Sequence, residues 1–225
     1  MRSTKHATME CTVKVIIISG RSGSGKSSTT YEAAHILKQL GIFHVTIEGD
    51  NLDTMFPKRD ESSLLFQNLK SVWAAYWRQA CVLWTRQVSN HTQFVVLLNG
   101  TGMVLQLERL EATIRDVVFA GEFAETNKVA VEVFPVILMA DETTVIERLT
   151  VREIGGELEE HLLSTRRMEA ILDGWSQRHD GIIERISSQS RDVHDVASEM
   201  LALAGIVLVE APASRDRVRV KKSSP

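Results

Sequence analysis

The sequence predicts an α/β protein in which helices cover both faces of a mainly parallel sheet. Apolar, β-branched segments of strand length alternate with segments of helical spacing along the chain, which is typical of βαβ units. The composition fits one globular unit, because 44% of the 225 residues are hydrophobic and 24% are charged. These proportions exclude wholesale disorder and fibrous structure. No internal repeat or domain boundary is evident.

The first strand is expected at residues 13–19, a β-branched run that ends at Gly20. Residues 26–40 have apolar positions at helical spacing, and Gly41 follows as a C-terminal cap. Further along, the pattern predicts a strand at 43–47, a turn-rich segment at 48–62, a long helix at 64–90, a strand at 94–98 and a helix at 103–119.

The second half of the chain is expected to continue the alternation. A fourth strand at 131–139 contains Pro135, which strands tolerate at their start or at a bulge. The remaining pattern predicts helices at 141–153 and 157–175, a strand at 182–186, a helix at 192–204 and a short strand at 206–209.

The charge is distributed unevenly along the chain. The formal net charge is −3, but residues 215–222 carry +4, so the remainder carries −7. We expect the basic tail, 211–225, to be disordered; a contact of this tail with RNA, a membrane or an acidic partner is the alternative. The acidic body argues against DNA as a partner, because nucleic-acid binding needs a broad basic face.

No export or membrane signal is visible in the sequence. The apolar run at 15–19 is far too short to span a bilayer, and residues 1–10 lack the apolar core of a signal peptide. The only cysteines, Cys11 and Cys81, lie in no metal-binding pattern, which favours a reducing compartment. The sequence therefore predicts a cytoplasmic protein.

Residues 20–27, GRSGSGKS, match the phosphate-binding loop pattern G-x-x-x-x-G-K-[ST] (the P-loop, or Walker A motif) at every defined position. A buried strand precedes this loop and an amphipathic helix follows it, as the motif requires. Glycines let main-chain N–H groups close around phosphates, Lys26 would reach the β- and γ-phosphates, and the Ser27 hydroxyl would bind Mg²⁺. The nucleotide-binding residues predicted here are Gly20, Arg21, Ser22, Gly23, Ser24, Gly25, Lys26, Ser27 and Ser28.

Other classes of P-loop protein fit less well. A guanine-specific GTPase needs N/T-K-x-D at a strand end, and the nearest match, at 127–130, has alanine in place of the aspartate and precedes a strand. Asp141-Glu142 after the fourth strand imitates the acidic pair of ATP-driven motors, but it equally suits a helix N-cap. A second helical domain, usual in that class, is also not evident.

A carboxylate segment follows the second predicted strand. Asp50 and Asp53 lie in the run EGDNLD, and a carboxylate there would lie close to the P-loop in such a sheet. It would orient an acceptor hydroxyl or take its proton. The alternative is a turn whose side chains satisfy the main chain.

Two arginines lie on one face of the predicted helix at 141–153. Arg148 and Arg152 are four residues apart, and Gly155-Gly156 follows at once. This arrangement suits a mobile lid that clamps ATP and excludes water from the transferring phosphoryl group. A solvated helix rich in glutamate is the alternative. Arg166 and Arg167 are further candidates for the lid, although surface exposure suits them better.

The chain resembles P-loop small-molecule kinases of the adenylate kinase, gluconate kinase and adenylylsulfate kinase type, and uncharacterised ATP-binding proteins related to them. The resemblance depends on the P-loop and on the runs EGDNL, VWAAYWRQA and RLTVREIGGELEEH. It implies a three-layer P-loop NTPase fold, a parallel sheet in the order 2-3-1-4-5, and a short helical lid at about 148–167. It also implies an N-terminal extension at 1–12 and a kinase-like domain at 13–210.

The resemblance further implies roles for single residues. Arg148 would face the nucleotide, Arg152 the phosphates and Asp50 the acceptor, while Gln189, after the fifth strand, would lie beside the adenine. One departure concerns Asn99, because many relatives have an aspartate there that holds a Mg²⁺-bound water. Either Asp50 supplies the missing carboxylate to the metal, or catalysis is slow, or the protein mainly binds ATP.

The long helix at 64–90 carries aromatic residues at helical spacing. Trp73, Tyr76 and Trp77 are explained by core packing or, alternatively, by an acceptor pocket in which Trp77 and Arg78 bind the substrate. With Asp50 and Asp53, these complete the predicted substrate residues.

The sequence thus predicts an ATP- and Mg²⁺-dependent phosphotransferase that acts on a small metabolite or nucleotide-like acceptor. Lys26, Asp50, Arg148 and Arg152 are the predicted catalytic residues, and Ser27 and Asp50 the metal ligands. A regulatory module that binds or hydrolyses ATP is the alternative. A monomer and a homodimer are both compatible with the sequence.

Overall fold

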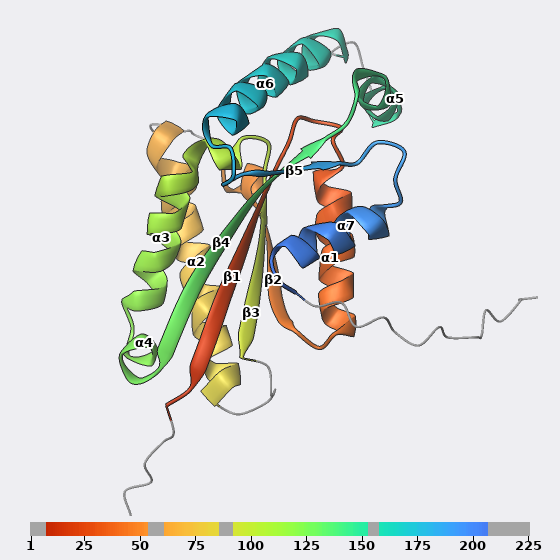
Figure 1. Cartoon of the computed structure of the whole chain (residues 1–225). Coiled ribbons are helices and arrows are strands. Elements are labelled where there is room, and N and C mark those ends of the chain that lie inside the picture. Colours follow the sequence, from red (N-terminus) through yellow and green to blue (C-terminus); the bar gives the residue numbers. More distant parts are fainter. Residues whose placement is uncertain (1–7, 54–60, 86–91, 153–157, 207–225) are drawn as a thin grey trace, which may run out of the picture.

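The computed structural model describes residues 8–53, 61–85, 92–152 and 158–206. Its centre is a five-stranded sheet in the order β2-β3-β1-β4-β5, in which every pair is parallel. The predicted sheet and its order are confirmed (Figure 1). The strands are β1 (Glu10–Ser19), β2 (Phe43–Glu48), β3 (Gln93–Asn99), β4 (Lys128–Met139) and β5 (Glu184–Ser187).

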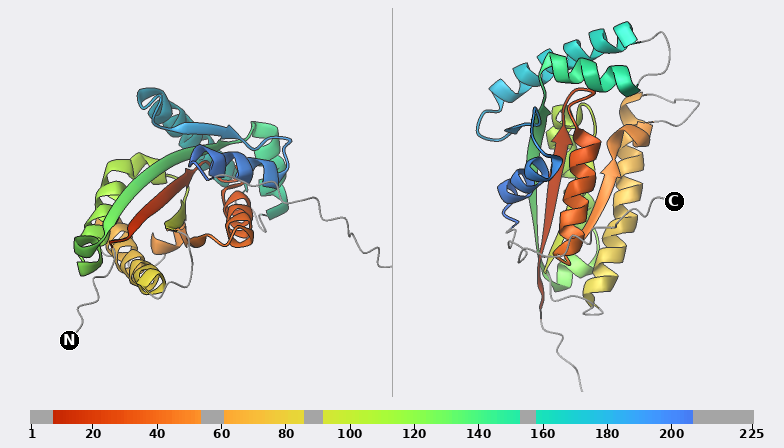
Figure 2. Two further views of the ribbon diagram at one scale, coloured as in Figure 1. Left: turned by 60° about the horizontal axis from the view of Figure 1, so that its bottom comes forward. Right: turned by 90° about the vertical axis from the view of Figure 1, so that its right-hand side faces the viewer.

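Helices cover both faces of the sheet, which confirms the three layers. The helices are α1 (Lys26–Gln39), α2 (Glu61–Thr85), α3 (Leu107–Phe119), α4 (Glu122–Thr126), α5 (Glu142–Arg152), α6 (Leu158–Arg178) and α7 (Val193–Leu203), with short 3₁₀ segments η1 (Gly49–Asp53) and η2 (Met103–Gln106). Helices α1 and α7 lie on one face and α2 and α3 on the other (Figures 1 and 2).

The central strand β1 is buried on both faces, which explains its nearly continuous apolar run. Val13, Val15 and Ile17 pack in the core beneath α2 and α3, whereas Ile16 and Ile18 pack beneath α1 and α7. Successive side chains of a strand point to opposite faces. A strand between two helical layers therefore needs apolar residues at odd and even positions alike.

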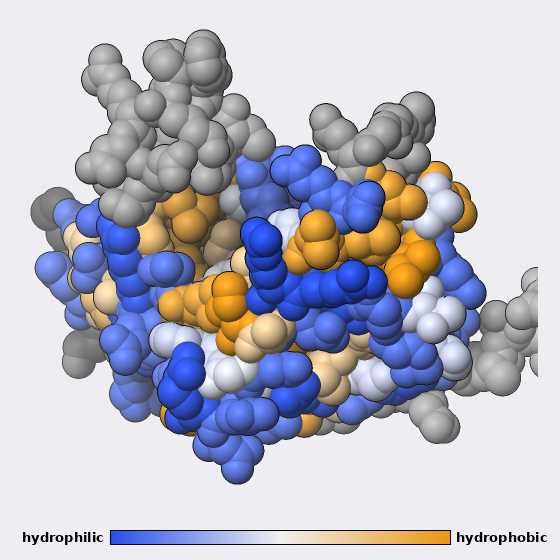
Figure 3. Space-filling model, turned by 90° about the horizontal axis from the view of Figure 1, so that it is seen from above, coloured by the Kyte–Doolittle hydropathy of each residue, from blue (hydrophilic) through white to orange (hydrophobic). Residues whose placement is uncertain are grey.

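Helices α5 and α6 lie across the end of the molecule to which the carboxyl ends of the strands point (Figures 1 and 2). Viewed from this end, the described surface is largely hydrophilic and carries several separate apolar patches (Figure 3). Exposed apolar residues on the two helices include Val151, Leu163 and Ile171. None of the helices within the described ranges is long and apolar enough to cross a membrane.

Pro135 lies in the middle of β4, where neither a strand start nor a bulge accommodates it. The Ser188 N–H donates to the Met139 carbonyl on the β5 side, and main-chain groups of a strand alternate in direction. Because Pro135 lies four residues before Met139, its main-chain nitrogen also faces the β5 side. Pairing with β5 begins only at Val136. The missing N–H of Pro135 therefore costs the sheet no hydrogen bond between β4 and β5.

The predicted elements differ from the structure mainly at their ends. Strand β1 begins at Glu10, so it includes residues assigned to the N-terminal extension. The short helix α4 was not predicted. Asp141 is an N-cap, because its Oδ1 accepts a hydrogen bond of 2.7 Å from the Thr144 N–H. Ile206 is not in a strand; residues 207–209, the basic tail and the Gly155-Gly156 break lie outside the described residues.

The tryptophans of α2 belong to the core, whereas Tyr76 is 40% exposed. Trp73 and Trp77 are 1% and 4% exposed. The ring of Trp77 meets those of Trp84 and Phe123 edge-on, at centroid distances of 5.8 Å, a favourable arrangement of aromatic quadrupoles. The prediction that Trp77 lines an acceptor pocket is therefore wrong. Core packing, the alternative interpretation, is confirmed for Trp73 and Trp77 but not for Tyr76.

Both cysteines are expected to react slowly with alkylating agents in the folded protein. Burial raises the pKa of the Cys11 thiol, and burial with the nearby Cys11 raises the pKa of Cys81 to about 12. Since the thiolate is the reactive form, at pH 8 the thiolate fraction of Cys81 should be about a thousandfold smaller than that of an ordinary thiol.

Mass spectrometry after timed exposure to iodoacetamide measures this difference, with the protein in urea as the fully reactive control. Labelling of Cys81 at equal rates with and without urea would contradict the expected protection.

Candidate functional site

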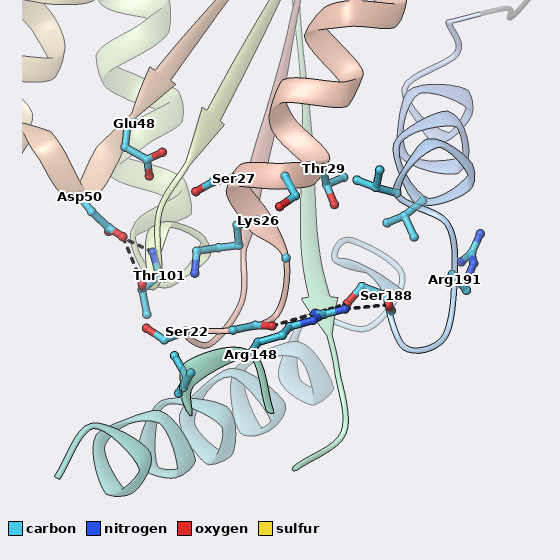
Figure 4. Close-up of a pocket in the computed structure, with 16 residues that line it drawn as sticks. Ser22, Lys26, Ser27, Thr29, Glu48, Asp50, Thr101, Arg148, Ser188 and Arg191 are labelled. Carbon is cyan, nitrogen blue, oxygen red and sulfur yellow. Dashed lines mark hydrogen bonds between the residues drawn. The ribbon is translucent and has the colours of Figure 1, made fainter. Parts of the chain in front are cut away.

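A cavity of about 550 Å³ opens at the carboxyl end of the sheet, beside the P-loop and the start of α1. Its walls come from segments far apart in the sequence (Figure 4). The lining residues are Ser22, Gly23, Gly25, Lys26, Ser27, Ser28, Thr29, Glu48, Asp50, Thr101, Arg148, Leu149, Ser188, Arg191, Val193 and Val196. The volume is in the range of small-molecule sites.

The P-loop takes a conformation that only glycine allows at its ends. Gly20 has a φ of 153°, and a Cβ there would lie 2.5 Å from both the Leu138 carbonyl oxygen and the Ser24 Oγ. Gly25 has a φ of 94° and is the N-cap of α1 with no side-chain hydrogen bond to the helix. The first turn of α1 thus lines the cavity and has no capping side chain, an arrangement that attracts anions.

Lys26 is held at the mouth of the loop. Its Nζ donates to the carbonyl oxygens of Gly20 at 2.9 Å and Arg21 at 3.3 Å. Its side chain lines the cavity together with the hydroxyls of Ser27 and Ser28. The sequence placed all three residues at a phosphate site, and the structure brings them together.

Arg148 connects α5 to the P-loop and to the segment after β5. Its Nη1 donates to the Gly23 carbonyl at 2.8 Å, and its guanidinium also reaches the Oγ and the carbonyl oxygen of Ser188 at 3.4 Å. The Ser188 hydroxyl in turn donates to the Ser24 carbonyl at 2.7 Å. Arg148 thus lines the cavity where the sequence placed it. Arg152 is the last residue of α5; its side chain lies outside the description.

The opposite wall carries two carboxylates. Asp50 accepts hydrogen bonds from the Thr101 N–H at 3.1 Å and from the Thr101 Oγ1 at 3.2 Å. Glu48, the last residue of β2, points toward Ser27 across the cavity (Figure 4). Sequence reasoning missed Glu48, although a simple signal existed: the carboxyl ends of adjacent parallel strands meet at one edge of the sheet.

Asn99 is buried beside the site and does not line the cavity. Its Nδ2 donates to the Thr30 Oγ1 at 3.1 Å, and its Oδ1 is buried without a hydrogen-bond partner in the described structure. The neutral amide fits this position because it can donate to a hydroxyl, which a carboxylate cannot.

A third wall, formed by α7 and the segment before it, was not predicted. Val193 and Val196 bring apolar side chains to the cavity, and Thr29 of α1 and Arg191 lie beside them. The sequence pattern assigned the two valines only to a helix, because their exposure depends on where that helix packs.

Several predicted site residues lie elsewhere. Gln189 donates to the carboxylate of Asp141 and is outside the cavity. Arg78 is exposed on α2 and also does not line it. For Asp53, the structure describes only the main chain.

Arg21 is the largest departure from the predicted site, because its side chain turns away from the cavity and is 3% exposed. Its guanidinium donates to the Ala140 carbonyl at 2.8 Å and forms ion pairs with Glu142 at 2.8 Å and Glu169 at 2.7 Å. Hydrogen bonds from Arg166 and Arg21 lower the pKa of Glu142, while burial raises the pKa of Glu169. The prediction that Arg21 binds the nucleotide is therefore wrong for its side chain, which does not line the cavity.

No family model matches the chain, and no curated protein matches it. Among solved structures, it is similar to a gluconokinase from Sinorhizobium meliloti 1021, with 17% identity over 85% of this chain and 91% of that chain and a TM-score of 0.48. It is also similar to the Mycobacterium tuberculosis APS kinase in complex with AMPPNP and APS, with 18% identity over 88% and 99% of the two chains and a TM-score of 0.42.

A third similar structure is the Deinococcus radiodurans tunicamycin resistance protein, with 14% identity over 88% of this chain and 99% of that chain and a TM-score of 0.49. At these identities and TM-scores, the likeness is one of chain architecture only.

Proposed function

We propose that this chain is an ATP-dependent phosphotransferase that acts on a hydroxyl or phosphate of a small acceptor. The observation that carries the proposal is the pairing of two walls around one cavity: a P-loop with Lys26 on one side and the carboxylate of Asp50 on the other. The first suits the phosphates of a nucleotide, and the second suits an acceptor that loses a proton.

The P-loop wall supports nucleotide binding through three kinds of group. Main-chain N–H groups at the start of α1 favour an anion. Lys26, whose Nζ donates to the loop carbonyls of Gly20 and Arg21, adds a positive charge that can turn toward the phosphates. Arg148 contributes a planar, permanently charged donor from the other side, suited to stabilise charge on a transferring phosphoryl group.

The residues present also fit a divalent cation. Ser27 and Glu48 offer oxygen donors that face each other across the cavity (Figure 4), and Mg²⁺ prefers oxygen ligands, usually one or two carboxylates with substrate phosphates. When bound, Mg²⁺ would neutralise charge on the phosphates. Glu48 thus supplies a carboxylate that Asn99 lacks, while Asp50 stays bound to Thr101 and available to the acceptor.

Asp50 is positioned for acid–base work by its neighbour. The N–H and the hydroxyl of Thr101 fix the direction of the Asp50 carboxylate. The remaining lone pairs of this carboxylate stay available to a molecule in the cavity, which Asp50 lines. Its role would be to orient the acceptor hydroxyl and accept its proton as the phosphoryl group leaves ATP.

An ATP-hydrolysing module without a small-molecule acceptor is the second candidate, favoured by the neutral Asn99 at the end of β3. Turnover of ATP with Mg²⁺, with and without a panel of hydroxylated metabolites, distinguishes the two. The panel includes gluconate, APS (adenylylsulfate) and shikimate, because the similar structures include the gluconokinase, the APS kinase and a shikimate kinase from Acinetobacter baumannii in complex with shikimate.

We expect one acceptor class to stimulate ADP formation and to gain phosphate, as measured by mass spectrometry. Slow hydrolysis that no acceptor changes would favour the second candidate. No binding of ATP at all would contradict both.

A further inference from the structure

The buried side chain of Arg21 has no role in the proposed chemistry, although it belongs to the P-loop. It projects to the side opposite the cavity and contacts the segment before α5 and both lid helices, α5 and α6. Burying a guanidinium costs free energy that only close partners offset. Arg21 is nonetheless only 3% exposed, and the geometry of the P-loop alone does not explain why a charged side chain is buried there.

The contacts of Arg21 form a branched network. One carboxylate, Glu142, begins α5 and also accepts a hydrogen bond of 2.6 Å from Arg166 of α6. The other, Glu169, lies on α6 and pairs with the same guanidinium at 2.7 Å. The guanidinium therefore ties the P-loop to two helices at once.

The main chain of Arg21 takes part in the same connection. Its carbonyl oxygen accepts hydrogen bonds from the Ser24 N–H at 3.2 Å and from the Lys26 Nζ at 3.3 Å. When Lys26 turns toward phosphates, it leaves this carbonyl, and the residue that holds the lid helices loses one of its restraints. On the cavity side, α5 touches the loop a second time, through Arg148 and the Gly23 carbonyl.

We propose that Arg21 is a positioning residue that couples the conformation of the P-loop to the placement of α5 and α6, and through α5 to Arg148. This inference rests on the proposed nucleotide site. Arginine suits the position because its fork of donors serves the Ala140 carbonyl and two carboxylates together, which the single ammonium of lysine cannot do with the same geometry.

The test compares Arg21→Met with the matched control Arg115→Met. Arg115 is a half-buried guanidinium on α3 that likewise binds a carboxylate, Glu111, and a carbonyl, that of Val131, but lies outside the cavity. Arg21→Lys and Glu169→Gln are milder variants that keep the test decisive if Arg21→Met does not fold.

Amide hydrogen exchange supplies the first readout, with AMPPNP and Mg²⁺ as the probe. In the wild type and in Arg115→Met, the probe should slow exchange both at the start of α1 and in α6. In Arg21→Met, protection should persist at α1 and disappear in α6. Nucleotide affinity should fall on the order of tenfold, within the usual range of coupling between sites, and Arg21→Lys should recover part of it.

A loss of stability alone would lower the melting temperature without changing which helix the probe protects. Equal α6 protection and equal affinity in Arg21→Met and the wild type would overturn the coupling. In the absence of nucleotide, α6 should already exchange faster in Arg21→Met than in Arg115→Met, and equal rates would also count against it. Failure of the wild type to bind AMPPNP would instead contradict the proposed function, and the nucleotide-free comparison would still decide whether Arg21 holds the lid helices.

Discussion

Replacing Lys26 with alanine is expected to reduce nucleotide-dependent turnover by about 10²–10³-fold, the usual cost of removing one preorganised charge or donor from a transition state. The variant loses the ammonium group that lies at the P-loop and lines the cavity. In the proposed site the phosphates would bind through this charge as well as through main-chain N–H groups, so ATP affinity should fall too. Calorimetric titration with ATP and a coupled ADP assay measure the two effects.

Lys38→Ala is the matched control for this substitution. Lys38 is exposed in the last turn of the same helix, α1, and does not line the cavity, so both quantities should stay near the wild-type values. Melting curves of the two variants separate loss of function from loss of fold. Unchanged affinity and turnover in Lys26→Ala would remove Lys26 from the mechanism.

Replacing Asp50 with asparagine should leave ATP affinity within about twofold and lower phosphoryl transfer to the acceptor by about 10²–10⁴-fold, as for loss of a general base. Asparagine keeps an oxygen that accepts a hydrogen bond from Thr101, so the local structure should persist. What disappears is the negative charge and the ability to take a proton. Transfer is measured with the acceptor that the metabolite panel identifies.

Asp116→Asn controls for the general effect of removing a carboxylate. Asp116 lies on α3, is exposed and forms a long ion pair of 3.9 Å with Lys70. It does not line the cavity, so its loss should change neither affinity nor transfer. If Asp50→Asn transferred phosphate at the wild-type rate, Asp50 would have no part in the chemistry. A large drop in ATP affinity would instead assign Asp50 to the nucleotide or its metal.

Much of the fold followed from local patterns. The β-branched run of β1, the helical spacing after Lys26 and the glycine after α1 are short-range signals, and the structure confirms each element. Parallel pairing followed from the alternation of strands and helices, since only crossover connections join parallel strands. The P-loop was equally visible, because its glycines and its lysine are required by backbone geometry and charge within eight residues.

The carboxylate wall shows where sequence reasoning became incomplete. Asp50 was predicted because it follows a strand, but Glu48 in the same run was overlooked. It stands opposite Ser27 only because β2 and β1 are placed on either side of β3. A motif read along the chain cannot measure that distance between strands.

Trp77 and Arg21 show a different limit. Each lies in a segment whose position was predicted, yet its side chain points away from the predicted site: Trp77 into the core and Arg21 toward α5 and α6. Propensity and spacing determine where strands, helices and the P-loop begin and end. The direction of a long side chain depends on which distant segments pack beside it, and for Arg21 those are Ala140, Glu142 and Glu169.

The sequence by itself therefore determined the alternation of elements and the phosphate-binding loop, because hydrophobic periodicity and glycine geometry act within a few residues. Only the tertiary structure decided which charges face the cavity and which are buried behind it. That choice depends on contacts between residues more than a hundred positions apart, such as Arg148 with Gly23 and Arg21 with Glu142.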